Sequence, residues 1–213
     1  NKNIKKAIIV FISLLISAVF IASILFGFTY VKDSILRNDN LILLETKNWV
    51  TTEYGAPGIT IETPEVLTRK LLGPNFTYLN SNNISEFAFS NNDNSMQIYV
   101  SNTRFNDKIK PEDFQKYIDY TLDIIEAKGL SNIVVKYENF TTANEAEGIK
   151  VYGSADFIDS NSSKIISGKY SILGFFTEDE FKQLIILYED DIYLNEITDK
   201  VISSVELIKN QQK

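Results

Sequence analysis

An uncharged stretch of 25 residues, 7–31 (AIIVFISLLISAVFIASILFGFTYV), constrains this sequence more than any other feature. As an α-helix it would be about 37 Å long, whereas the hydrocarbon core of a bilayer is about 30 Å thick. Lys2, Lys5 and Lys6 precede the stretch and Lys32 follows it. A helix buried in a soluble protein would be shorter and would carry a polar face. The stretch therefore predicts an uncleaved transmembrane helix.

A cleavable signal peptide is the alternative interpretation of this stretch. Signal peptides have an apolar core of roughly 7–15 residues, followed by a cleavage site with two small residues one position apart. Here the apolar run is longer, and only Gly27 and Thr29 imitate such a site. The chain has no cysteine, which excludes bacterial lipoprotein processing.

Lysines on the N-terminal side favour an N-terminus in the cytoplasm, because positive residues flank the cytoplasmic ends of membrane helices. We expect residues 1–6 to form a cytoplasmic N-terminus, residues 7–31 a transmembrane helix, residues 32–54 a connecting segment and residues 55–213 an extracytoplasmic, periplasmic domain. These boundaries predict a single-pass protein of the inner (cytoplasmic) membrane. Abundant Asn, Lys, Ile and Tyr indicate an AT-rich bacterial source. The net charge of −7 argues against nucleic-acid binding, which needs basic patches.

Small residues give the predicted membrane helix one narrow face. At 100° per residue, Ser13, Ser17, Ser23 and Gly27 fall within about 120° of one another. Such a face lets a second helix approach closely, so we predict helix packing there. The alternative is that small residues are simply common in membrane helices. The expected partners are the membrane and another protein.

The remaining sequence alternates between strand and helix patterns. The last expected strand is apolar on both faces, which places it at the centre of a sheet covered on both sides. Pro111 suits the start of a helix and Gly129 suits the position after its end. The expected elements are strands over 59–63, 85–90 and 95–104, a helix over 111–128, strands over 132–138, 148–157, 164–176 and 181–189, and a closing helix over 190–208. This order predicts an α+β fold: an α/β/α sandwich whose roughly six-stranded, mostly antiparallel sheet has a helix on each face.

Residues 55–208 resemble the PsbP-like domains in the order and hydrophobic rhythm of their elements. A short strand ending at Pro64 is followed by a hairpin, a long helix and four strands, the last of which runs into a helix with the sequence VISSVEL at 201–207. Val66 and Leu67 stand where the family usually has an aromatic residue near the first proline. The resemblance implies an α/β/α sandwich with a non-enzymatic adaptor or accessory role, and it transfers no functional residues.

The inventory of reactive side chains is nearly empty. Without histidine or cysteine, the chain lacks Ser-His-Asp and Cys-His arrangements and the common zinc sites. We therefore predict no catalytic residues, no cofactor, no metal and no enzymatic activity. The acidic residues at 178–180 and 189–191 are interpreted as a solvated turn and a helix cap. Residues 91–94 (NNDN) could offer oxygen ligands to calcium, but they lack the EF-hand spacing.

Two functions fit these expectations. The leading hypothesis is a membrane-anchored extracytoplasmic adaptor, or an accessory subunit of a bacterial envelope complex, that binds a protein partner. The alternative is a binding module for a small hydrophobic ligand or lipid, held in a cleft between sheet and helix. A deep apolar cavity would favour the ligand, whereas a flat exposed apolar patch would favour a protein partner.

Overall fold

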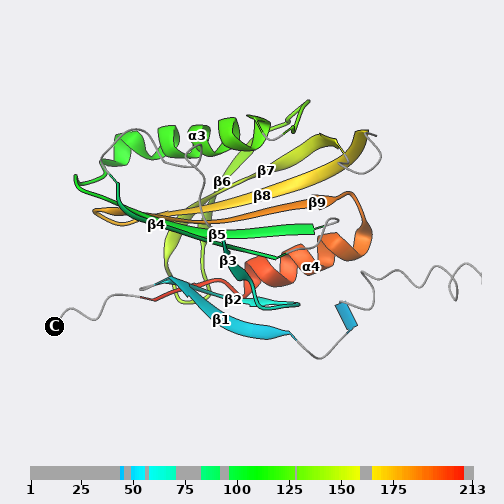
Figure 1. Ribbon diagram of the computed structural model, residues 1–213, viewed down its shortest axis with the longest axis horizontal. Coiled ribbons are helices and arrows are strands. Elements are labelled where there is room, and N and C mark those ends of the chain that lie inside the picture. Colours follow the sequence, from blue (N-terminus) through cyan, green and yellow to red (C-terminus); the bar gives the residue numbers. More distant parts are fainter. Residues whose placement is uncertain are drawn as a thin grey trace, which may run out of the picture. The chain divides into compact units, whose positions relative to one another are not determined.

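A computed structural model shows that the chain forms two compact units, residues 1–45 and residues 46–213. The structure describes residues 44–45, 49–55, 58–70, 83–91, 96–127, 129–158 and 165–208. Only two of these residues belong to the first unit. The described sheets, and the two helices that pack on them, therefore belong to the second unit (Figure 1).

The strands of the second unit form two antiparallel sheets. In the described residues, the smaller sheet has the order β1-β2-β10 and the larger sheet the order β3-β4-β5-β9-β8-β7-β6 (Figure 1). The smaller sheet contains β1 (Val50–Gly55), β2 (Gly58–Thr63) and β10 (Glu206–Leu207). The larger sheet contains β3 (Thr68–Lys70), β4 (Asn83–Ser90), β5 (Met96–Phe105), β6 (Lys136–Thr141), β7 (Glu147–Ile158), β8 (Ile165–Phe176) and β9 (Glu180–Glu189).

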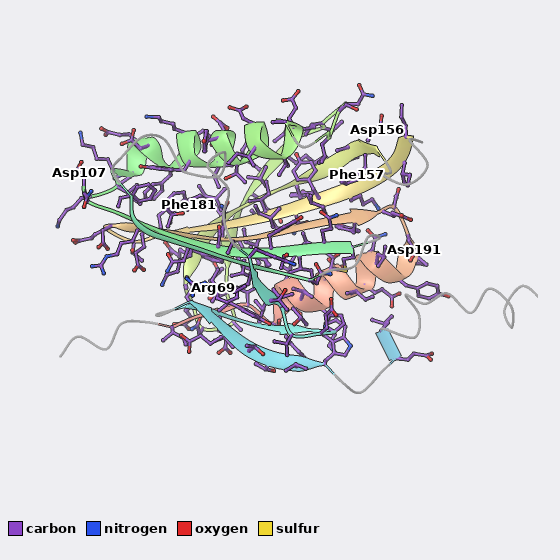
Figure 2. The ribbon with its side chains drawn as sticks, viewed as in Figure 1. Arg69, Asp107, Asp156, Phe157, Phe181 and Asp191 are labelled. Carbon is purple, nitrogen blue, oxygen red and sulfur yellow. The ribbon has the colours of Figure 1, made fainter. Side chains whose placement is uncertain are left out.

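One face of the larger sheet is covered by α3 (Phe114–Ala127), which follows a single 3-10 turn, η2 (Pro111–Asp113). Ile118 and Ile125 lie on the buried side of α3, and each such side chain contributes roughly 1.5–3 kcal/mol when it is fully buried. Phe176 stacks between Phe114 and Phe181, with ring centroids 4.0 and 4.5 Å apart, and Figure 2 labels Phe181 beneath the helix. The main hydrophobic core therefore lies between α3 and the sheet.

The opposite face is covered by α4 (Ile192–Ser203), which packs against β9 and β2. Asp191, labelled in Figure 2, begins this helix as its N-cap, because its carboxylate accepts the backbone N–H groups of Tyr193 and Leu194. Ile197 and Val201 are fully buried, so the predicted apolar stripe of the closing helix is confirmed at these positions. The helix ends at Ser203, however, and residues 206–207 form a strand.

The predicted α/β/α sandwich is wrong. The described residues are mainly strand, in sheets of seven and three strands with two short helices, and the expected sheet had about six strands. The reason lies in the pairing of β2. This strand pairs with β1 on one side and β10 on the other, so it belongs to the second sheet. Residues 59–63 were expected in the main sheet, 206–207 in the closing helix and 50–54 in the connecting segment.

The predicted transmembrane helix finds no support in the structure. Residues 7–31, with Ser13, Ser17, Ser23 and Gly27, lie outside the described part of the chain. Where the structure does describe the chain, no helix is long and apolar enough to cross a membrane. The helix α3 has 14 residues and α4 has 12, against about 20 for a span. The single-pass, inner-membrane assignment is corrected accordingly and is not retained.

Candidate interaction surface at the edge of the larger sheet

The first predicted acidic cluster divides between the surface and the interior. Glu178 and Asp179 lie in the turn between β8 and β9, where they pair with Lys108 (2.6 Å) and Arg104 (2.9 Å) in exposed ion pairs. The solvated turn is confirmed for these two residues. Glu180, by contrast, begins β9 and is only 7% exposed.

The second acidic cluster organises the start of α4. Asp191 caps the helix as predicted, and Asp190 forms a 2.6 Å ion pair with Lys169. The hydrogen bond from Lys169 holds the pKa of the Asp190 carboxyl below its usual value. Asn91 closes the β4–β5 turn, because its side-chain oxygen accepts a backbone N–H of β5 (2.8 Å), and residues 92–94 lie outside the described residues. Among the described residues, no group of three acidic side chains could hold a metal ion.

A buried polar cluster that was not predicted from the sequence lies on the central strand β9 and on its neighbour β5. The Lys182 ammonium and the Glu180 carboxylate are 3.2 Å apart, and their side chains are 4% and 9% exposed. Asn102 is directly opposite Lys182 on β5, and its side-chain oxygen has no hydrogen-bond partner. The sequence pattern of residues 181–189 predicts a strand with apolar side chains on both faces. A lysine within an otherwise apolar central strand was the available signal.

The β6 end of the sheet is largely exposed, since five of the six residues of β6 are exposed. Within the described residues, β6 is the last strand of the larger sheet and pairs only with β7. The pairing continues before β6, through a bridge between Ser131 and Asp156 and a 2.9 Å hydrogen bond from Val134 N–H to the Ser154 carbonyl (Figure 2 labels Asp156). We call residues 134–141, on the side facing away from β7, the β6 edge.

Every second residue of the β6 edge turns its backbone outward. The N–H groups of Val134 and Thr142 both bond inward, to Ser154 and Ala146 (2.9 Å each). Since the backbone groups of an antiparallel strand alternate between its two sides, the residues with odd numbers direct their N–H and C=O groups away from β7. These outward residues are Val135, Tyr137, Asn139 and Thr141.

Large apolar side chains gather on this edge. Seven large hydrophobic side chains are exposed in the described part of the chain, and three of them are Val134 (51%), Val135 (38%) and Tyr137 (48%). The Tyr137 hydroxyl lies 3.4 Å from the Asp119 carboxylate, which places this side chain on the α3 side of the sheet. Partial burial, together with the charge of Asp119, raises the pKa of Tyr137.

The other face of the β6 edge carries charges. Lys150 of β7 pairs with Glu138 (2.8 Å) and lies 4.9 Å from the centre of the Tyr152 ring. Lys136 approaches the same ring from β6, at 6.0 Å. The strand therefore presents apolar and aromatic groups on the α3 side, and alternating positive and negative charges on the opposite side.

A buried tyrosine holds the beginning of the β6 edge in place. The Tyr170 hydroxyl donates a 2.9 Å hydrogen bond to the Val134 carbonyl, and burial raises the pKa of Tyr170 to about 12. Gly153 lies beneath the same carbonyl, and a Cβ atom added there would be 1.8 Å from the Val134 oxygen. Only glycine lets the chain approach β7 so closely at this position. The exposed valines thus sit on a fixed backbone.

Comparisons with known proteins add little to this geometry. No family model and no curated protein matches the chain. A crystal structure of a protein from Bacteroides thetaiotaomicron VPI-5482, at 11% sequence identity, matches with a TM-score of 0.40. The match covers 78% of this chain and 50% of that one, so this chain spans about half the length of the protein it matches. A similarity this weak carries no argument about fold or function, and the resemblance to PsbP-like domains stays a prediction.

Proposed function

We propose that this protein is a protein-binding adaptor or accessory module, and that it binds an extended protein segment along the β6 edge. The observation that carries the proposal is the coincidence, at one edge, of outward backbone groups with three exposed apolar side chains. A segment that adds to a sheet as a further strand gains main-chain hydrogen bonds, and contacts with alternate side chains give it specificity.

The opposite end of the sheet supports this choice of surface. Natural proteins protect sheet edges with short strands, charges and bulges, because an exposed edge pairs readily with other chains. In the described part of the chain, the other end of the sheet is β3, which has three residues, two of which are Arg69 and Lys70. The strand β6 is twice as long, and Val134 and Val135 extend it with apolar side chains. Of the two ends, the β6 edge is the one suited to accept a strand.

The chemistry of the edge defines the kind of segment that fits. Toward α3, apolar side chains would cover Val135 and Tyr137, which are 38% and 48% exposed. On the other face, an acidic residue would lie opposite Lys136 and a basic residue opposite Glu138. The partner is therefore an extended segment in which apolar residues alternate with charged ones.

Photo-crosslinking in the source cells tests the proposal. A photoreactive aromatic residue in place of Tyr137 should capture a discrete protein, whereas the same residue at Val66, which is 54% exposed outside the edge, should not. Asn139→Pro removes an outward N–H and should abolish the capture, while Asn139→Ala keeps that N–H and should preserve it. Equal capture at both positions, or none at Tyr137, would refute the proposal. Binding of a small hydrophobic ligand or lipid stays a prediction.

A further inference from the structure

We infer that the strand received by the β6 edge is the β6 edge of a second copy of this chain, paired antiparallel about Tyr137. The inference rests on the proposed function, since it names the partner of the same surface. It follows from the spacing of two opposite charges, Lys136 and Glu138, on either side of one outward residue. A symmetric pair of strands brings each lysine opposite the glutamate of the other copy.

Backbone geometry restricts the possible registers. In an antiparallel pair, outward residues of one strand must oppose outward residues of the other, because only they exchange hydrogen bonds. A two-fold axis through any single residue of the edge satisfies this condition. A two-fold axis at Lys136 places Lys136 of one copy opposite Lys136 of the other, and an axis at Glu138 does the same for the two glutamates. Like charges directly opposite each other disfavour both registers.

An axis at Tyr137 is the register that satisfies both charges. Lys136 then faces Glu138 of the second copy, and the two-fold symmetry repeats this pair. Both residues turn their backbones inward, so they form a non-hydrogen-bonded pair, in which opposed side chains lie closest. An axis at Val135 or at Asn139 leaves both charges opposite uncharged residues. Charge complementarity therefore selects the register centred on Tyr137.

The outward residues complete the pairing in this register. Tyr137 opposes its own copy on the α3 side, and Val135 opposes Asn139 of the other chain. These three residues exchange about six backbone hydrogen bonds with the second copy. The two seven-stranded sheets would become continuous, and α3 of each copy would lie on the same face, because the two-fold axis is perpendicular to the sheet. The edge of each copy would then cover the exposed apolar side chains on the edge of the other copy.

The intramolecular partner of Glu138 is compatible with this arrangement. Glu138 already accepts Lys150 at 2.8 Å, and its side chain is 43% exposed. A carboxylate has two oxygens that can accept from two cations. Lys136 of the second copy would thus join Lys150 at the same carboxylate.

Single-cysteine crosslinking of the chain in cells tests the register, because residues 1–213 contain no cysteine. Residues opposed in a hydrogen-bonded pair have Cα atoms about 5.5 Å apart, which suits a disulfide. Tyr137→Cys should therefore form a disulfide-linked dimer under mild oxidation. Val135→Cys or Asn139→Cys alone should give several times less dimer. Co-expressed, these last two variants should crosslink to each other.

Charge variants test the same pairing in the Tyr137→Cys background. Lys136→Glu and Glu138→Lys should each reduce the disulfide-linked dimer several-fold, because each opposes like charges twice. Mixing the two variants should restore the dimer, since both ion pairs are then re-formed between the chains. Unchanged thermal unfolding of each variant would show that folding is intact.

The outcomes separate this inference from the proposed function. Equal yields of disulfide-linked dimer from the three single-cysteine variants would overturn the register about Tyr137. A dimer yield that the charge variants do not change would overturn it as well. If Tyr137→Cys gives no dimer while the photoreactive residue at 137 captures a different protein, the second copy is excluded and the adaptor function stands. If both experiments fail, neither proposal survives.

Discussion

The strands β9 and β6 belong to one sheet but meet opposite conditions. Among the strands that the structure describes, β9 is the fourth of seven, and eight of its ten residues are buried. The strand β6 ends this sheet, and five of its six residues are exposed. Both strands pair antiparallel with their neighbours, so the difference in exposure arises because β9 lies between two strands whereas β6 pairs with one described strand. A central strand must satisfy every group inside the protein, whereas an end strand can offer its groups to another chain.

The polar residues of the two strands show what this difference means. Lys182 of β9 is paired with Glu180 inside the sheet, where an unpaired charge would be strongly destabilising. Glu138 of β6 is paired with Lys150 at the surface, where ion pairs contribute only about 0–1 kcal/mol. The same chemical pair is thus enclosed within the fold in one place, and remains accessible to another chain in the other.

Introducing a charge should give the largest contrast between the two strands. Leu184, at the centre of β9, has no exposed surface, and Leu184→Asp should abolish cooperative unfolding because the carboxylate has no partner there. Tyr137→Asp places the same charge on the β6 edge and should leave a cooperative transition. Circular dichroism during heating compares the two variants. A cooperative, wild-type-like melt for Leu184→Asp would contradict the central position of β9.

Breaking the buried ion pair should be the next largest effect. Lys182→Ala leaves Glu180 buried and unpaired, and we expect a loss of about 3–5 kcal/mol in the free energy of unfolding. Lys150→Ala, the surface counterpart, should cost about 0–1 kcal/mol. Urea denaturation measures both variants. Similar losses would show that burial does not distinguish the two pairs.

The hydrogen bond from the Tyr170 hydroxyl, which lies beneath the β6 edge, should contribute about 1 kcal/mol to the free energy of unfolding. Tyr170→Phe removes the hydroxyl that donates to the Val134 carbonyl. Tyr170 should also make the free energy of unfolding depend on pH. Its pKa is raised from 10.0 to about 12 in the folded protein, so its contribution is complete below pH 10 and is lost as the pH rises from 10 to about 12.

Urea denaturation at neutral pH measures the first effect, and comparison of wild type with Tyr170→Phe between pH 9 and about 12 measures the second. The difference in unfolding free energy between the two proteins should shrink as the pH rises above 10.0, the ordinary pKa of tyrosine. A difference that stays constant over this range would refute the role of the neutral hydroxyl.

The smallest expected effect on stability is at the β6 edge itself. Tyr137→Ser removes a half-exposed ring, and its free energy of unfolding should stay within about 0.5 kcal/mol of wild type. Capture of a partner by a photoreactive residue placed at the neighbouring outward position, Val135, should nevertheless fall, because the Tyr137 ring is part of the proposed contact. A large loss of stability would assign Tyr137 to the fold, and unchanged capture would remove it from the surface.

The centre of this sheet could be predicted from sequence, and its edge could not. Residues 184–188 are apolar on both faces of the strand, and this pattern correctly placed β9 between two covered faces. No comparable signal marks β6, whose sequence KYENFT has no clear alternation, and residues 132–138 were expected where the strand spans Lys136–Thr141. A strand's place at the end of a sheet depends on which strands pair, and that is a long-range property.

The second sheet was missed for a related reason. The strands β1 and β10 have six and two residues, and each is recognisable only through its pairing with β2. Val205 and Ile208 continue the apolar stripe of α4 at helical spacing, so the periodicity extended the predicted helix through residues 206–207 to residue 208. In the structure, the Asn144 side chain binds both backbone groups of Leu207, at 2.6 Å and 3.3 Å, and holds it as a strand. A contact 63 residues away in sequence decided the local structure.

Amide hydrogen exchange along β6 in the purified full-length protein tests the central claim most directly. If the β6 edge accepts a second copy, the outward amides of Tyr137 and Asn139 should be protected at high protein concentration and should lose this protection on dilution. The inward amides of Lys136 and Glu138 should stay protected throughout, because they bond to β7. Rapid exchange of Tyr137 and Asn139 at every concentration would contradict pairing of the β6 edge with a second copy.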